Sequence, residues 1–342
     1  MRNKEEEILQ RPIPIDPENA KHVHFRVRRK LPGRRLDKYL HGRYPHLSRT
    51  AIQRLIRQGA VTVNGSAAKP SYEMNGGDLI EMTMPDPEPP DIVAQDIPLD
   101  ILFEDEHIIA INKEAGIVCH PAHAAQTGTI ANALAYYSAN LSSGSDPFRP
   151  GIVHRLDKNT TGVMLTAKTD EAHWRLSLQF ETRTIQKIYL AVVSGGMELD
   201  GDTIDLPIGM HPVVREKIAV MIKPNKINVA KNAVTHWEVA ERFRGYTLVK
   251  LSPKTGRTHQ LRVHMSYIGH PVVGDQMYGG PPASMRALTG AGDETPFMPY
   301  QALHAWRIEF KHPIKETPMS IEAPFRTNFK KLMRVLRRHR SV

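Results

Sequence analysis

The segment Gly151-Ile-Val-His-Arg-Leu-Asp-Lys-Asn-Thr-Thr-Gly162, followed by the apolar run Val163-Met-Leu-Thr-Ala167, is the most informative stretch of this chain. It places one carboxylate, Asp157, beside His154 and Arg155 and directly before a run typical of a β-strand. A turn that abuts a strand exposes side chains at a sheet edge while the sheet holds the backbone still. The alternative is that Asp157 only caps its own Asx-rich turn, and the segment alone leaves both interpretations open.

The whole segment resembles the signature of the RluA-type pseudouridine synthases, in which His-Arg-Leu-Asp precedes a Thr-Ser-Gly or similar turn. Thr161 stands where serine is more usual and keeps a hydroxyl group. Further blocks of the chain resemble the same family: Lys187-Ile-Tyr-Leu-Ala-Val-Val193, Gly256-Arg-Thr-His-Gln-Leu-Arg-Val-His264 and Gly269-His-Pro-Val-Val-Gly-Asp-Gln-Met-Tyr-Gly279.

The resemblance implies three catalytic residues. Asp157 would be the catalytic carboxylate, acting as a nucleophile toward the sugar or base or by removing a ribose proton. Tyr189 would lie against the uracil, although a strand tyrosine is in general more often core packing. Arg257 would lie beside Asp157, where a guanidinium would keep a buried carboxylate ionised.

Arg155 and His154 are candidate RNA contacts beside the catalytic residue. A uridine within a stacked helix must be flipped out before chemistry can reach it. The flat guanidinium of Arg155 is suited to stacking in the space that the base leaves. An ordinary ion pair within the loop is an equal alternative on sequence alone.

Residues 34–84 resemble an S4 domain, a small RNA-binding module. A short helix and an Arg-rich helix precede Val61-Thr-Val-Asn-Gly65 and Gly77-Asp-Leu-Ile80, which predict strands and turns. By analogy, the basic side chains of this module would contact the RNA backbone. The candidate RNA contacts here are Arg35, Arg49, Arg54 and Arg57.

Positive charge is segregated at two parts of the chain. The formal net charge is +10, yet residues 21–60 carry twelve Lys or Arg against one acid, and residues 326–342 carry seven with no acid. Segregation of this kind suits a polyanionic partner such as RNA. A solvated charged face is the alternative.

Composition and pattern predict a five-part organisation. The expected parts are a disordered lead-in (1–21), an S4-like domain (22–84), a Pro-rich linker (85–95), a catalytic domain (96–325) and a basic C-terminal helix (326–342). Within the large domain, residues 170–183 predict a helix with Trp174, Leu178 and either Leu176 or Phe180 facing inward, and residues 279–299 predict a Gly/Pro-rich surface insertion.

The fold class predicted for the large domain is α+β. Strand patterns outnumber helices, and short connections between them favour antiparallel pairing. We therefore expect a mixed, mostly antiparallel sheet flanked by helices and loops, preceded by the small α/β S4-like domain.

Several classes of chemistry lack their sequence signals. The chain has one cysteine, Cys119, so it has no internal disulfide, and a reducing cytoplasm is the expected compartment. There is no phosphate-binding Gly-rich loop, and the 17 histidines lack acids at metal-ligand spacing. We expect no metal, no cofactor, no membrane association and a monomer.

The function that the sequence predicts is an RNA pseudouridine synthase acting on large-subunit ribosomal RNA. A synthase acting on tRNA is one alternative, and a non-catalytic RNA-binding or ribosome-assembly factor that keeps the fold is another. A glycoside hydrolase ranks behind these, because it would need a second acid and only Asp275 is an obvious candidate.

Overall fold

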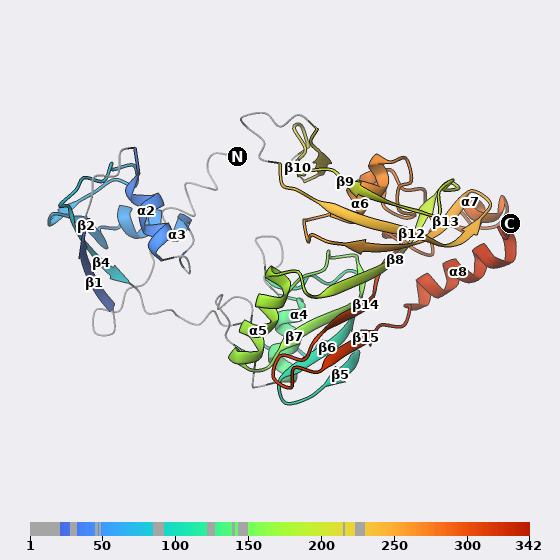
Figure 1. The fold of residues 1–342 in the computed structure, drawn as a ribbon, viewed down its shortest axis with the longest axis horizontal. Helices are drawn as coiled ribbons and strands as arrows, with labels where there is room; N and C mark the ends of the chain where they lie inside the picture. The colour runs from blue at the N-terminus through green and yellow to red at the C-terminus, as the bar shows by residue number, and fades with distance from the viewer. Residues whose placement is uncertain are drawn as a thin grey trace. The chain divides into compact units, whose positions relative to one another are not determined.

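The structure is a computed structural model in which the chain forms two compact units, residues Met1–Asp91 and Ile92–Val342 (Figure 1). The expected lead-in over residues 1–20 and most of the expected linker lie outside the residues that it describes. Those residues are 21–27, 33–44, 47, 49–84, 92–121, 127–138, 141–142, 150–214, 216–222 and 230–342.

The first unit is an antiparallel sheet covered by two helices. Its strands are β1 (Lys21–Arg26), β4 (Leu79–Met84), β2 (Val61–Val63) and β3 (Ser66–Ala67), in that order across the sheet. Helix α2 spans Leu36–Arg43 and helix α3 spans Arg49–Arg57. Apolar residues of α3 recur at helical spacing, so that Ile52, Leu55 and Ile56 are all buried in one core.

The second unit is built on a nine-stranded sheet. The order across it is β5-β6-β7-β14-β8-β13-β12-β9, and β15 pairs with β14. The strands are β5 (Ile101–Glu104), β6 (Ile108–Lys113), β7 (Thr161–Ala167), β8 (Gln186–Ser194), β9 (Gly201–Asp205), β12 (Val234–Phe243), β13 (Tyr246–Pro253), β14 (Leu303–Lys311) and β15 (Pro318–Glu322). Strands β10 (Ile208–Met210) and β11 (Ile218–Val220) form a separate hairpin.

Helices pack against this sheet (Figure 1). They are α4 (Ile130–Tyr137), α5 (Asp170–Glu181), α6 (Gln260–Tyr267), the short 3-10 helix η1 (Gln276–Tyr278), α7 (Met285–Thr289) and α8 (Thr327–His339). Among the described residues, every pair of neighbouring strands is antiparallel except β7 with β14. The predicted α+β class with a mixed, mostly antiparallel sheet is therefore confirmed.

Strand β14 joins the two halves of the sheet. Its first residues pair in parallel with β7, where Ala305 lies opposite Gly162, and its other edge pairs with β8. A Cβ atom on Gly162 would overlap the backbone carbonyl of Ala305, and the φ angle of 115° at this position also disfavours a side chain. Only glycine therefore fits at the end of the Thr-Thr-Gly turn.

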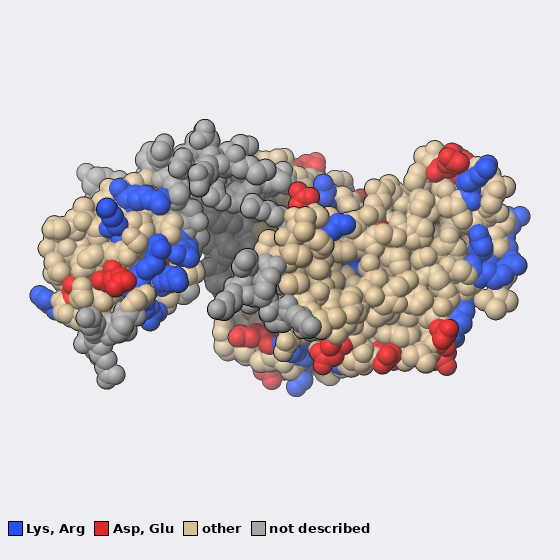
Figure 2. All heavy atoms as spheres, turned by 90° about the horizontal axis from the view of Figure 1, so that it is seen from above, with Lys and Arg blue, Asp and Glu red and all other residues tan. Residues whose placement is uncertain are grey.

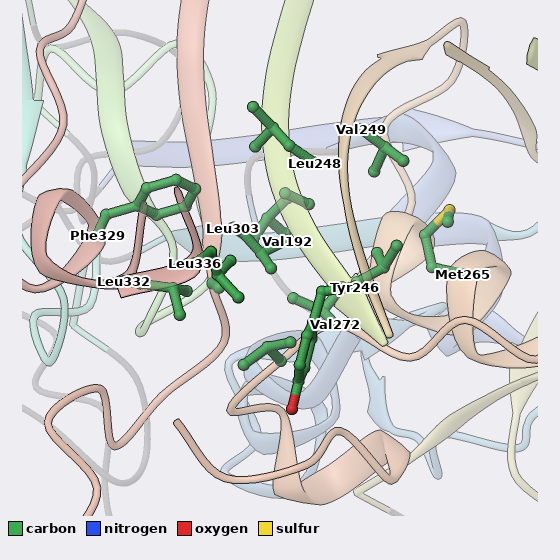
Figure 3. Close-up of a cluster of buried hydrophobic side chains, with 14 of the residues drawn as sticks. Val192, Tyr246, Leu248, Val249, Met265, Val272, Leu303, Phe329, Leu332 and Leu336 are labelled. Carbon is green, nitrogen blue, oxygen red and sulfur yellow. The ribbon is translucent and has the colours of Figure 1, made fainter. Parts of the chain in front are cut away.

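The second unit has two hydrophobic cores, one on each side of this junction. Side chains of β8, β13, α6 and α8 form one of them, as Figure 3 shows. Strands β6 and β7 with helices α4 and α5 supply the other. Tyr189 on β8 packs against both cores, so it lies where the two halves of the unit meet.

Two expectations about local structure are wrong. On α5, Trp174 and Leu178 are 64% and 42% exposed, because the buried stripe runs through Ala172 and Leu176. Residues 279–299 are not a surface insertion: they contain α7, and Leu288 is fully buried in the core. Their Gly and Pro residues form turns between packed segments.

The helices of the described residues include none that is both long and apolar enough to cross a membrane.

Candidate active site

Asp157 lies in an irregular loop that leads into β7, and two buried side chains fix this loop. Lys113, at the end of β6, donates from Nζ to the backbone carbonyls of Lys158 at 2.9 Å and Thr160 at 3.1 Å. The thiol of Cys119 exchanges hydrogen bonds with the backbone of Leu156, at 3.3 Å each. The backbone on both sides of Asp157 is therefore held by the protein interior.

A guanidinium lies beside Asp157, and it belongs to Arg262. Its Nη1 atom is 3.2 Å from Oδ2 of Asp157, while Nε and Nη2 bind both oxygens of Asp275 at 2.6 and 2.8 Å. The side chains of Arg262, Asp157 and Asp275 are 8%, 24% and 1% exposed. Asp275 therefore fixes the position of the arginine, and Asp157 is the carboxylate of the two that solvent can reach.

These groups face a cleft with a volume of 790 Å³ in the second unit. That volume falls within the range of small-ligand sites, about 300–1,000 Å³. Its walls come from the Asp157 loop, the end of α5, the start of β8, the end of β13 and the start of α6. All five candidate residues of this unit line it, namely His154, Arg155, Asp157, Tyr189 and Arg257.

Tyr189 is in this cleft as a neutral phenol. It is partly buried on β8, between β13 and β14. Burial, with a further contribution from the charge of Asp157, raises the pKa of Tyr189 well above its ordinary value near 10. The hydroxyl therefore keeps its proton at neutral pH.

The expectation that Arg257 pairs with Asp157 is corrected by the structure. Helix α6 begins at Gln260 rather than near Arg257, so Arg257 lies in the preceding turn and its Nε donates to the backbone carbonyl of Asn232 at 3.2 Å. Arg262, five residues later in the same sequence block, is carried by the helix to the carboxylate. The sequence block that supplies the arginine was predicted correctly, but the residue that contacts Asp157 is Arg262 and not Arg257.

His154 and Arg155 differ in what they offer to a ligand. Nε2 of His154 accepts a hydrogen bond from the backbone N–H of Leu165 at 2.8 Å, and its ring stacks on Phe180 with centroids 4.6 Å apart. Burial, with a smaller contribution from the charge of Lys187, lowers the pKa of His154 to about 3. His154 thus brings no positive charge to RNA, whereas Arg155 is exposed at the cleft.

His259 is a further polar group of the cleft that sequence reasoning missed. The Tyr278 hydroxyl accepts a hydrogen bond from the backbone N–H of Ile218 at 3.0 Å and lies 2.8 Å from Nδ1 of His259. Burial is the main cause that lowers the pKa of His259. The residue therefore lines the cleft as a neutral polar side chain.

Two of the four candidate arginines of the first unit bind one buried acid. Arg35 and Arg49 both bind Asp37, at 3.0 and 2.9 Å, yet their side chains remain 40% and 45% exposed. Burial raises the pKa of Asp37, but hydrogen bonds from Gln53 and the two arginines outweigh it and lower the pKa. Arg54 is partly exposed and Arg57 exposed. Figure 2 shows Lys and Arg gathered on the side of this unit where α3 lies.

Metal ligands are not clustered in the part of the chain that the structure describes. No group of three or more His, Cys, Asp or Glu side chains there is placed to hold a metal ion. Asp275, the second acid considered from the sequence, does not line the cleft and is occupied by Arg262. Glu181 and Glu238 also line the cleft as exposed carboxylates, but among the described residues Asp157 is the cleft carboxylate that contacts the buried guanidinium of Arg262.

Comparison with known proteins gives consistent matches over most of the chain. A family model described as RNA pseudouridylate synthase matches residues 107–267, and the S4 domain model matches residues 34–80. Ribosomal large subunit pseudouridine synthase D of Pseudomonas aeruginosa is 42% identical over 317 residues, which cover 92% of this chain and 95% of that protein. An uncharacterized RNA pseudouridine synthase of Bacillus subtilis, YlyB, is 41% identical over 305 residues, 89% of this chain and 95% of that protein.

Among solved structures, human RNA pseudouridylate synthase domain containing 4 superposes with a TM-score of 0.53. It is 25% identical, and the match covers 70% of this chain and 93% of that one.

Proposed function

The chain belongs to the RNA pseudouridylate synthase family and carries an S4 domain, and on that premise we propose that it isomerises specific uridines of large-subunit ribosomal RNA to pseudouridine. The family assignment makes it an isomerase. The choice of large-subunit RNA is supported by the relative named ribosomal large subunit pseudouridine synthase D, which the chain matches along nearly its whole length.

The observation that carries this proposal is the contact of Asp157 with Arg262 inside the cleft. Nη1 of Arg262 lies 3.2 Å from Oδ2 of Asp157, so a charge-assisted hydrogen bond orients the carboxylate in the cleft. Arg262 can play this part because Asp275 fixes it through two hydrogen bonds. Asp157 is in turn fixed through its loop by Lys113 and Cys119.

The reaction breaks the bond from N1 of uracil to C1′ of the ribose and forms a bond from C5 to C1′. The proton on C5 is lost and N1 gains one, so the overall change is an isomerisation without an external reactant. An ionised Asp157 serves either route open to it, attack on the sugar or base or removal of a ribose proton. Both need the carboxylate held still beside the flipped nucleotide.

Tyr189 is assigned to holding the uracil. Its aromatic ring lies at the cleft wall and offers a stacking face, while its raised pKa excludes a standing phenolate as a base at neutral pH. Arg155, exposed beside Asp157, is assigned to the space that the flipped base leaves. Arg257 and the neutral side chain of His259 are further polar groups at the cleft for contacts with phosphate or base.

The first unit is assigned to binding the RNA backbone through Arg35, Arg49, Arg54 and Arg57. Half-exposed guanidinium groups of this kind position RNA without reading its sequence. An enzyme with this substrate would work where ribosomes are made and used, in the cytoplasm.

Replacement of Asp157 by Asn tests the proposal directly. With large-subunit ribosomal RNA carrying 5-tritiated uridine, the wild-type protein should release tritium and the Asp157→Asn variant should not, while both bind the RNA. The matched control is Asp202→Asn, which removes an exposed carboxylate on β9 outside the cleft and should keep full activity. Wild-type turnover by Asp157→Asn would show that the catalytic assignment is wrong.

A further inference from the structure

Helix α8 has two faces of opposite character. Its apolar face is buried in the core, with Phe329, Leu332, Met333, Val335 and Leu336 all at most 8% exposed; Figure 3 shows three of these side chains in the core. Its outer face carries five exposed cations, Lys330, Lys331, Arg334, Arg337 and Arg338, and the helix contains no acidic residue. Packing against the core explains the first face and leaves the second unexplained.

Part of the charge on the outer face opposes the stability of the helix, although Arg337 and Arg338 in its last turn interact favourably with the helix dipole. Lys330, Arg334 and Arg338 follow one another at i, i+4 and i+8, and like charges at this spacing cost about 0.2–0.5 kcal/mol per pair. Lys330 and Lys331 also lie in the first turns, where the helix dipole disfavours positive charge. A helix that needed only a polar outer face would be more stable with acids among these positions.

Other parts of the protein engage only some of these cations. Arg337 pairs with Glu241 at 2.8 Å, and Lys331 lies over the ring of Phe297 at 4.7 Å from its centroid. Lys330, Arg334 and Arg338 form no ion pair with any residue that the structure describes. These three, called here the α8 basic face, make a row about 12 Å long on the helix. Figure 2 shows Lys and Arg gathered at this end of the unit.

The chemistry of the face fits one kind of partner. It offers closely spaced, exposed positive charges without any intervening acid, which is what a phosphate backbone requires. A membrane surface is a poorer fit, because an amphipathic helix binds lipid through its apolar face and that face is buried here. None of the described residues that line the cleft belongs to α8, so the face is separate from the proposed active site.

We propose that the α8 basic face is a second RNA-binding surface of the catalytic unit, which binds phosphates of the substrate RNA away from the target uridine. This proposal rests on RNA as the substrate and adds to it a surface distinct from both the cleft and the S4 domain. The face contributes affinity and salt dependence and takes no part in the chemical step.

The test compares two variants of the full-length protein. Lys330→Gln/Arg334→Gln/Arg338→Gln removes the three charges, and Arg334→Lys/Arg338→Lys keeps them as the matched control. Because the side chains are exposed, both variants should fold; the control should melt at the wild-type temperature, and the neutral variant at that temperature or slightly above it, since two repulsive pairs are lost. Affinity for a large-subunit ribosomal RNA transcript is titrated over a range of potassium chloride concentrations, and tritium release is measured at saturating RNA.

The neutral variant should show a slope of log affinity against log salt that is shallower by about 2, since each lost phosphate contact removes about 0.7–0.9. The charge-retaining control should keep the wild-type slope, and the turnover at saturating RNA should be the same in all three proteins. An unchanged slope in the neutral variant overturns the proposal. The proposal is also overturned if the wild-type protein binds phosphatidylserine vesicles, the neutral variant does not, and the RNA slope is the same for both proteins.

The proposed isomerase activity and the proposed RNA-binding surface can be refuted independently of each other. If the wild-type protein releases no tritium but the slope difference is observed, the isomerisation is refuted and the RNA surface stands. If tritium release is normal and the slopes are equal, the surface is refuted and the enzyme stands.

Discussion

The guanidinium of Arg262 contacts the carboxylate of Asp157 through a single nitrogen, at 3.2 Å. Its other nitrogens are held by Asp275. Among the described residues, only Oδ2 of Asp157 accepts a side-chain hydrogen bond. The contact therefore orients the carboxylate of Asp157 and leaves Oδ1 for a substrate.

Removal of this guanidinium should impair the chemical step. In Arg262→Gln, Asp157 and Asp275 lose their shared cation, and we expect kcat to fall by about 100-fold, as for other preorganised electrostatic groups. The matched variant Arg257→Gln removes an arginine from the same cleft that contacts a backbone carbonyl instead. It should raise KM for RNA and leave kcat near the wild-type value. Single-turnover tritium release over a range of RNA concentrations separates the two effects. If Arg257→Gln lowered the rate of the chemical step and Arg262→Gln only weakened RNA binding, the catalytic role would belong to Arg257.

Lys113 should make activity sensitive to alkaline pH. Burial lowers the pKa of Lys113 from 10.5 to about 8. Its protonated Nζ donates to three carbonyls, those of Glu114, Lys158 and Thr160, and a neutral amine has one N–H fewer. The loop of Asp157 loses a hydrogen bond as pH rises through about 8, so kcat should fall there.

Alkaline pH should affect stability and activity in opposite directions through Lys113, because it should raise the free energy of unfolding. Between its folded pKa of about 8 and its ordinary value of 10.5, the unfolded chain binds more protons than the folded one. The free energy of unfolding should therefore gain from this group as pH rises through that interval. Urea unfolding and kcat measured on the same pH series separate the two effects. A kcat that stays constant to about pH 9.5 would contradict the role assigned to Lys113.

Variants of Tyr189 should separate its ring from its hydroxyl. Tyr189→Phe keeps the stacking face and should bind RNA as the wild type does, whereas Tyr189→Ala should lose about 10-fold in affinity or more, as loss of one base–aromatic contact predicts. Because burial and the charge of Asp157 raise the pKa of Tyr189, the wild-type rate should show no rise between neutral pH and about pH 10. Such a rise, absent in Tyr189→Phe, would mean that a phenolate acts as base.

Gly162 should be the least replaceable glycine of the central sheet. In Gly162→Ala the new methyl group meets the backbone of Ala305, and φ is 115°, so we expect a loss of more than about 3 kcal/mol of stability. Gly245→Ala, at a φ of 79° with open space around it, should cost only about 1 kcal/mol. Chemical denaturation compares the two. Similar losses would show that the sheet can shift to accept a side chain.

Deletion of residues 1–90 should weaken RNA binding and leave the catalytic unit folded. The two units have separate hydrophobic cores, so the remaining chain should still unfold cooperatively. The slope of log affinity against log salt should become shallower, because phosphate contacts of the S4 arginines are lost. Equal slopes for the full and shortened chains would contradict an electrostatic role of this domain.

Sequence reasoning reached the family, the fold class and the residues that share the cleft. Asp157, Tyr189 and Arg257 come from three distant blocks, and all three line one cavity. This worked because the blocks are long and specific. The burial of Lys113 under the loop had no local signal, since it depends on β6 and the loop lying side by side in the sheet.

The sequence could not settle which arginine meets the carboxylate. Arg257 and Arg262 lie in one block, and the choice depends on the residue at which α6 begins, which is the least predictable feature of a helix. The inward face of α5 was only partly predicted. Leu176 was one of the inward candidates and is buried together with Ala172, whereas Trp174 and Leu178 are exposed.

The insertion of β14 between β7 and β8 has a consequence for biosynthesis. Asp157 precedes one neighbour of this strand and Tyr189 lies on the other, while β14 itself is made only at residues 303–311. A growing polypeptide that has not yet emerged as far as this strand cannot bring the two together. The proposed site is therefore expected to assemble only after β14 has been synthesised and has emerged from the ribosome.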